Sequence, residues 1–224
     1  MKYVSACLLG ILSIVLSFMT LDENNKFFNV LSSEGESTSK RIPLRYRCVI
    51  SLVLGIIGFS ATLMLHKNCS LEINVIRLQI AYLGMLGAAC VDFRERRIPN
   101  VFPAAMALIG LLCLAIMYFT DSDGAFSYIL SSLLACVACV ICTLLIYALT
   151  KGGIGMGDIK LLSALSLLAG ANALGCTAAI GALSCGVVTI VLLLAKKKDI
   201  KKDSLPFAPF AFLGYAVSII LPIA

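Results

Sequence analysis

The sequence has few charged residues and a single histidine. Of its 224 residues, 13% are charged and 60% are hydrophobic. A soluble domain of this length has no interior large enough to bury so much apolar surface, so the composition excludes a soluble protein. The one histidine, His66, is expected in a loop at the end of a span, and a Ser-His or His-metal mechanism therefore has little to build on.

A disulfide framework is also missing, although the chain has ten cysteines. Most of them lie in apolar runs, where cysteine acts as a small hydrophobic residue. Cys136, Cys139 and Cys142 have CxxC spacing, but no histidine or acidic residue accompanies them, which disfavours a zinc site. The formal charge of +6 does not favour nucleic-acid binding, because the basic residues lie in loops where membrane topology already explains them.

Long apolar runs recur along the chain, and a membrane-spanning helix needs about 20 apolar residues. We therefore expect an all-α, polytopic membrane protein with about eight transmembrane helices. The predicted spans are 3–21, 48–65, 75–91, 101–119, 126–149, 159–174, 176–195 and 207–223. The sixth and seventh form one apolar stretch, broken only around residues 170–172 and Gly175, and are either two short helices or one long bent helix. The first run lacks a cleavage site and is predicted to be retained as a span.

Basic residues are distributed unevenly between alternate loops. With the N-terminus outside, the outer side and its span ends hold Lys2, Lys67 and Arg77, and all the other Lys and Arg residues lie on the cytoplasmic side. This agrees with the positive-inside rule. The same assignment places Asp92 and Asp158 at the cytoplasmic face, so that the two carboxylates can meet there.

Asp92 and Asp158 each lie where an apolar run meets a polar loop, and they are the candidate catalytic residues. Asp92 ends a predicted helix and precedes Arg94, Arg96, Arg97, Ile98, Pro99 and Asn100. Asp158 begins a predicted helix and follows Gly152, Gly153, Gly155 and Gly157. A pair of carboxylates can share one proton and activate a water, as in aspartic proteases. Taken alone, Asp92 also fits an ordinary topogenic loop, and Asp158 a glycine-rich hinge.

Four further features are predicted to support this pair. Glycines allow another chain to approach closely, which gives Gly155 and Gly157 a supporting role. Pro99 can open the helix that follows Asp92, and Lys160 is close enough in sequence to pair with either aspartate. The last span begins with a proline- and phenylalanine-rich segment that contains Pro206, Phe207 and Pro209. This segment is either a simple helix start with aromatic anchors or a rigid entry segment packed beside the site.

Together, DFRERRIPN, GGIGMGDIK and LPFAPFAFLG resemble the motifs of the type IV prepilin peptidase family, in the same order. The family consists of polytopic GxGD-type aspartic peptidases of the bacterial cytoplasmic membrane. The resemblance covers the chain from about residue 76 and implies catalytic roles for Asp92 and Asp158. It also implies removal of the short basic leader from prepilins or pseudopilins, as in type IV pilus, competence and protein secretion systems.

The N-terminal part departs from the family pattern. Many members carry a cytoplasmic loop with two CxxC pairs that resembles a zinc site, whereas the corresponding loop here, residues 22–47, is short and has no cysteine. We therefore expect no zinc. Larger members also methylate the new N-terminus with S-adenosylmethionine, which would be a cofactor here only if methylation is retained. Residues 1–75 are interpreted as a two-span N-terminal region and residues 76–224 as the peptidase domain.

The favoured interpretation is thus a membrane aspartic endopeptidase, whose partners are prepilin-like substrates and the lipid bilayer, with no nucleic acid. One alternative is a proton- or cation-coupled transporter that uses paired carboxylates. Glycine-interrupted helices would suit it, but both aspartates are expected at one membrane face and no inverted repeat is visible. A presenilin-like protease and an inactive scaffold are further alternatives. Neither the specific substrate nor the oligomeric state follows from the sequence.

Overall fold

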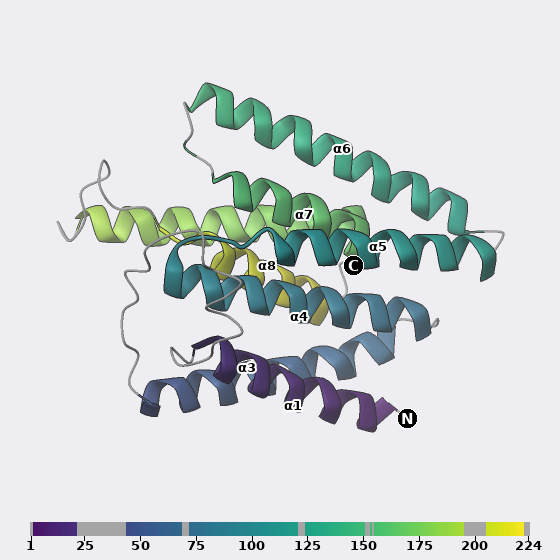
Figure 1. Ribbon diagram of the computed structural model, residues 1–224, viewed down its shortest axis with the longest axis horizontal. Helices are drawn as coiled ribbons and strands as arrows, with labels where there is room; N and C mark the ends of the chain where they lie inside the picture. Colours follow the sequence, from purple (N-terminus) through teal and green to yellow (C-terminus); the bar gives the residue numbers. More distant parts are fainter. Residues whose placement is uncertain are drawn as a thin grey trace.

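The computed structural model describes residues 2–21, 44–68, 72–120, 124–150, 153, 155–194 and 205–221, and all regular structure in these ranges is helical. Six of the helices are long and apolar enough to cross a membrane, and the last is shorter. The prediction of an all-α polytopic membrane protein is confirmed. In order, the helices are α1 (Lys2–Leu21), α3 (Leu44–Asn68), α4 (Glu72–Glu95), α5 (Val101–Thr120), α6 (Ala125–Leu149), α7 (Met156–Leu194) and α8 (Ala208–Ile220) (Figure 1).

The first five predicted spans correspond to α1, α3, α4, α5 and α6, with ends that differ by a few residues. Because α3 begins at Leu44 and ends at Asn68, His66 lies in its last turn, and its prediction as a loop residue was wrong. Most of the predicted cysteine-free loop, residues 22–43, lies outside the described residues. The count of eight spans and the outside position of the N-terminus stay predictions.

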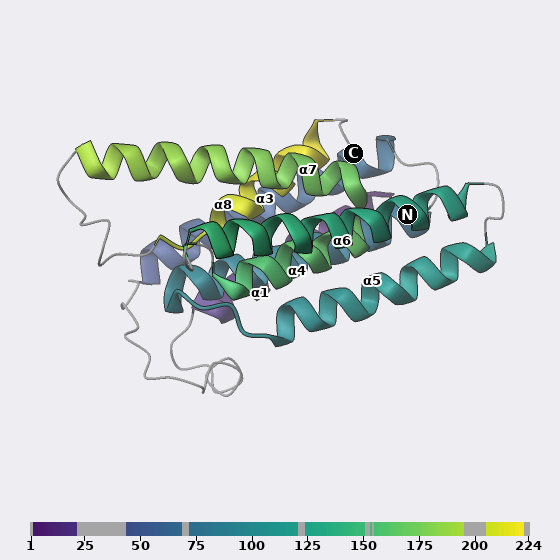
Figure 2. The same cartoon turned by 90° about the horizontal axis from the view of Figure 1, so that it is seen from above.

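The structure resolves the ambiguous stretch into two helices. α7 contains one residue with non-helical backbone angles, Gly170 (φ 88°, ψ 177°). A side chain on this residue would be strained, and its Cβ would collide with the hydroxyl of Tyr128. At Gly170 the chain folds back, so the two halves of α7 run in opposite directions (Figures 1 and 2). The break comes at Gly170, whereas a Cβ on Gly175 would meet nothing within 4 Å.

α4 lies at the centre of the bundle and contacts α1, α3, α5, α7 and α8. Its Tyr82 packs edge-on against Phe212 of α8, with ring centroids 5.2 Å apart. Tyr215 of α8 donates a hydrogen bond to the carbonyl of Leu78 (2.9 Å). On the other side of α8, Gly214 packs so closely on the backbone of the second half of α7 that a Cβ would not fit. α8 is thereby held between α4 and α7.

Neighbouring helices alternate in direction, which defines the two ends of the bundle. α4 ends at the same end at which α7 and α8 begin, on the left of Figure 1. The start of α4 and the turn at Gly170 lie at the opposite end. The loops that carry the two candidate aspartates therefore meet at one end, as the alternation of spans predicted.

Candidate active site

Asp92 lies in the last turn of α4 and is only 5% exposed. Its Oδ2 accepts a hydrogen bond from the backbone N–H of Ala208, 3.0 Å away. Ala208 is the first residue of α8, whose N–H has no partner within its own helix. The positive end of the α8 dipole therefore stabilises negative charge on Asp92, although Asp92 stands at the unfavourable end of α4.

The start of α8 explains why its N–H faces Asp92. Phe207 caps the helix without a side-chain hydrogen bond (φ −86°, ψ −34°), and Pro209 follows in the first turn. A proline there costs no helical hydrogen bond, and together with Pro206 it restricts the backbone on both sides of Ala208. The structure thus places the proline-containing entry segment directly against Asp92.

Asp158 lies in the first turn of α7. Its backbone N–H donates to the carbonyl of Gly155 (3.1 Å), which begins the helix. Gly155 also lies against the carboxylate, because a Cβ added to it would be 3.0 Å from Asp158 Oδ2. The requirement for glycine at this position is therefore one of space beside the carboxylate. Residues 152 and 154 of the glycine motif lie outside the described residues.

The two carboxyl groups approach each other closely enough for their charges to interact. A helix N-terminus lies beside each carboxyl group: that of α7 beside Asp158 and that of α8 beside Asp92. A carboxyl group that feels the charge of a second carboxylate holds its proton more tightly, so such a pair can hold one proton in common. This is the arrangement needed for one carboxylate to act as a base and the other as an acid.

Two contacts join the loop after Asp92 to the start of α7. Gly157 packs on Ile98, where an added Cβ would come within 3.0 Å of the Ile98 Cβ. Lys160 Nζ donates to Asn100 Oδ1 at 2.9 Å, whereas the sequence suggested an aspartate as its partner. α5 begins at Val101, so Pro99 precedes the helix instead of opening it. Gly157, Lys160 and Asn100 therefore position the two loops relative to each other.

The end of α4 is fixed by further contacts. Arg96 has a left-handed conformation (φ 55°), and its N–H donates to the carbonyl of Asp92 (2.8 Å), which closes the helix. Arg94 donates to the carbonyl of Thr20 at the end of α1 (3.2 Å) and pairs with Glu95 (2.6 Å). These contacts hold the turn that carries Asp92 against α1.

Two neighbours of the aspartates were not identified from the sequence. The hydrogen bond to Asp92 comes from the backbone N–H of Ala208, so the type of residue at position 208 gave no indication of this contact. The thiol of Cys185 lies close enough to Asp158 to interact with it electrostatically, because the turn at Gly170 brings the second half of α7 back to this end. In the sequence, Cys185 is one of several cysteines in apolar runs.

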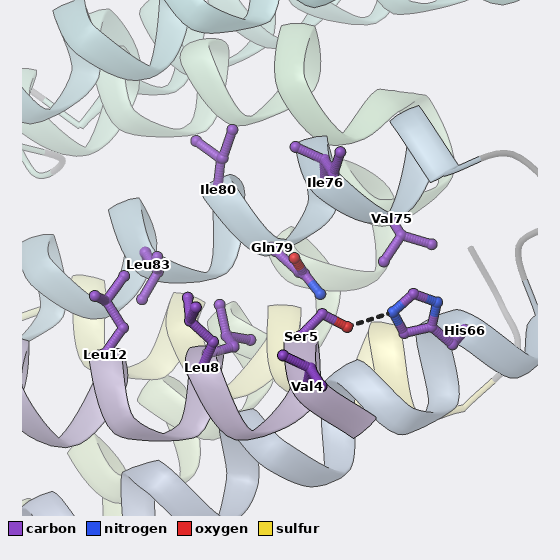
Figure 3. Close-up of a pocket in the computed structure, with 11 residues that line it drawn as sticks. Val4, Ser5, Leu8, Leu12, His66, Val75, Ile76, Gln79, Ile80 and Leu83 are labelled. Atoms are coloured by element: carbon purple, nitrogen blue, oxygen red, sulfur yellow. Dashed lines mark hydrogen bonds between the residues drawn. The ribbon is translucent and has the colours of Figure 1, made fainter. Parts of the chain in front are cut away.

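The structure also contains a Ser-His pair that the sequence did not suggest (Figure 3). Ser5 Oγ and His66 Nε2 are 2.6 Å apart in a groove of about 500 Å³ between α1, α3 and α4. The described lining residues are otherwise apolar except Gln79, and none is a carboxylate that could orient the histidine as in a catalytic triad. The pair satisfies two polar groups and ties α1 to α3.

No three His, Cys, Asp or Glu side chains are grouped as metal ligands within the part of the chain that the structure describes. Cys136, Cys139 and Cys142 lie along α6. Most of the loop in which family members carry the zinc-like cysteines lies outside the described residues. The expectation of no zinc therefore still rests on the sequence of that loop.

Comparisons with known proteins point to one family. The sequence model described as the type IV leader peptidase family matches residues 79–195, which is slightly more than half of the chain and includes both aspartates. A preflagellin peptidase from Methanococcus voltae is 36% identical over 94 residues. That match covers 42% of this chain and 38% of the relative. No solved structure matches the chain with comparable significance.

Proposed function

Because the chain belongs to the type IV leader peptidase family, we propose that it is a membrane aspartic endopeptidase that removes the leader from prepilin-like precursors. The observation that carries this proposal is the meeting of Asp92 and Asp158 at one end of the bundle, where Asp92 is buried, Asp158 is half-buried, and each lies beside a helix N-terminus. The N-termini supply positive potential, and α7 and α8 hold the two carboxylates in fixed positions.

The proposed reaction uses one water between the two carboxylates. One carboxylate takes a proton from the water as it attacks the scissile carbonyl carbon, and the other, protonated, donates a hydrogen bond to the carbonyl oxygen. The C–N bond then breaks, and the amine leaves with a proton from the pair. The Ala208 N–H favours the charged form of Asp92, whereas Asp158 has its own helix N-terminus, so the first proton is assigned to the pair and not to one residue.

The substrate is proposed to be a precursor with a short basic leader followed by an apolar helix. Its apolar helix would lie in the bilayer beside the bundle, with the leader at the cytoplasmic face of the cytoplasmic membrane. The similar archaeal protein is named for preflagellin, which adds preflagellin-like precursors to the prepilins and pseudopilins.

A cleavage assay tests this proposal. Purified full-length protein in lipid would be given a prepilin-like substrate whose basic leader ends in glycine. We expect cleavage after that glycine, and the mass of the product would also show whether S-adenosylmethionine in the reaction leads to methylation. Failure of folded protein to cleave prepilin, pseudopilin and preflagellin leaders would contradict the proposal, and proton-coupled flux in proteoliposomes would then support a carboxylate transporter.

A further inference from the structure

A second cavity, of about 380 Å³, lies at the end of the bundle opposite the aspartates. It is formed between α3, α4, α6, α7 and α8, and its volume falls within the range of small-molecule sites, about 300–1,000 Å³. Arg77, which lines it, is about 22 Å along α4 from Asp92 at 1.5 Å per residue. The cavity is therefore separate from the candidate active site. Its polar lining residues are Asn74, Arg77, Tyr128, Ser131, Asn172 and Ser218.

Arg77 is the charged residue of this cavity, and it is only 6% exposed. Its guanidinium lies over the ring of Tyr128, 4.2 Å from the centroid. Its Nε and Nη1, and the Tyr128 hydroxyl, are buried without a hydrogen-bond partner among the described residues. A cation–π contact offsets part of the cost of burying a cation, but the N–H donors still need an acceptor. Asn74 Oδ1, which lines the same cavity and is also buried without a described partner, is one acceptor within the chain, and a bound ligand would supply acceptors for the other N–H groups.

A helix N-terminus faces the same cavity. Because the chain folds back at Gly170, the second half of α7 begins at Ala171, and both residues line the cavity. The first N–H groups of a helix have no partner within it and carry a partial positive charge. None of the described lining residues is a carboxylate. The guanidinium and the helix N-terminus thus form two independent features that favour an anion.

We propose that this cavity binds a phosphate group, held by Arg77 and by the N-terminus of the second half of α7. The planar guanidinium matches phosphate oxygens in a bidentate manner, and helix N-termini are common phosphate sites. Arg77 lies within one turn of Asn74, where the apolar span of α4 begins, which is the depth of lipid headgroups. The headgroup of an anionic phospholipid and free phosphate share this chemistry.

The test compares the two sources of phosphate on the full-length protein and does not depend on cleavage. The protein is placed in phosphatidylcholine nanodiscs, with or without phosphatidylglycerol, and separately in detergent with inorganic phosphate or chloride at equal ionic strength. Thermal unfolding and native mass spectrometry are measured. We expect phosphatidylglycerol to raise the unfolding temperature and to remain bound, because a ligand of the folded state stabilises it. Stabilisation by inorganic phosphate alone would assign the site to free phosphate.

Arg77→Gln should reduce retention of the bound phosphate compound about tenfold or more, because it removes charge-assisted hydrogen bonds. Lys67→Gln is the matched control, since Lys67 is an exposed cation in the last turn of α3 at the same end. It should leave retention unchanged. Tyr128→Phe keeps the ring under the guanidinium and removes only the hydroxyl, so it should give a smaller loss and remain folded.

Three results would overturn the proposal. In the first, neither phosphatidylglycerol nor phosphate stabilises the wild type. This result would rule out phosphate binding even if Arg77→Gln fails to fold. In the second, Arg77→Gln retains phosphatidylglycerol as well as Lys67→Gln does. The third result concerns Asp121 and Asp123, which lie outside the described residues. If Asp121→Asn together with Asp123→Asn lowers the unfolding temperature as much as Arg77→Gln does, and phosphatidylglycerol does not change the unfolding temperature, the proposal fails. Arg77 would then be neutralised by the chain itself.

Discussion

The two ends of the bundle use the same structural element for opposite purposes. At the aspartate end, the N-termini of α7 and α8 serve two carboxylates that belong to the chain, Asp158 and Asp92. At the arginine end, the N-terminus of the second half of α7 faces a cavity with a buried cation, Arg77, and no described carboxylate. A helix N-terminus attracts negative charge in both places. Where the chain itself supplies the negative charge, we propose a reaction site, and where a ligand must supply it, we propose a binding site.

The largest expected effect comes from removing one charge at the aspartate end. Asp92→Asn or Asp158→Asn should lower kcat for leader cleavage by about 10³-fold or more, because neither variant can share a proton between two carboxyl groups. Arg97→Gln is the control, since Arg97 is an exposed charged residue of the loop that follows Asp92. It should retain cleavage within a few-fold. Substantial cleavage by purified Asp158→Asn protein would show that the aspartate end is no reaction site.

Gly155→Ala should disturb the aspartate end without removing a charge. Its Cβ would lie 3.0 Å from Asp158 Oδ2 and would displace the carboxylate. The carboxylate would have to move by a few tenths of an ångström. This is less than the misplacement of about 1 Å that costs about 100-fold, so we expect kcat to fall by about tenfold in the leader-cleavage assay. Gly175→Ala is the control within the same helix, because its Cβ would contact nothing. Equal rates for both variants would mean that the position of Asp158 is not critical.

Gly170→Ala should destabilise the protein at the end of the bundle that contains Arg77. The residue has φ 88° and touches the Tyr128 hydroxyl, so the substitution should lower the free energy of unfolding by about 1–3 kcal/mol. Thermal unfolding in detergent would measure this. Gly175→Ala should be neutral or stabilising, since alanine favours helix over glycine by about 1 kcal/mol. A Gly170→Ala protein as stable as the wild type would argue against the turn that forms the cavity.

The smallest expected effect concerns the link between the two loops of the aspartate end. Asn100→Ala removes the acceptor of Lys160, and the hydrogen bond is exposed, so cleavage should fall only about threefold. Lys160→Met should have the same effect, and the double variant should be no worse than either single one. Strictly additive losses would show that the two residues act separately.

The sequence predicted the local features of the site well. Apolar runs indicated the helices, and the alternation of spans brought Asp92 and Asp158 to one end. The glycines before Asp158 were predicted to let another chain approach closely; the structure shows Ile98 packed on Gly157, and the approach of a substrate stays a prediction. These features follow from the chain near each residue, where spacing and residue type carry the information.

Contacts between distant segments could not be predicted. Ala208 meets Asp92 across 116 residues and uses a backbone N–H, which every residue except proline has. Arg77 fitted the positive-inside count as an outer residue, whereas its burial over the ring of Tyr128 depends on a contact between α4 and a distant residue of α6. The choice between one helix and two depended on the backbone angles of Gly170, because several nearby residues could have broken the helix equally well.

The turn at Gly170 also has a consequence for the surrounding lipid. The first half of α7, from Met156 to the turn, has about 14 residues and is about 21 Å long at 1.5 Å per residue. The hydrocarbon core of a bilayer is about 30 Å thick. This hydrophobic mismatch means that the membrane beside α7 thins locally or that water reaches below its surface at the ends of the half-helix. Asp158, in the first turn of that half-helix, would then meet water without leaving the bundle.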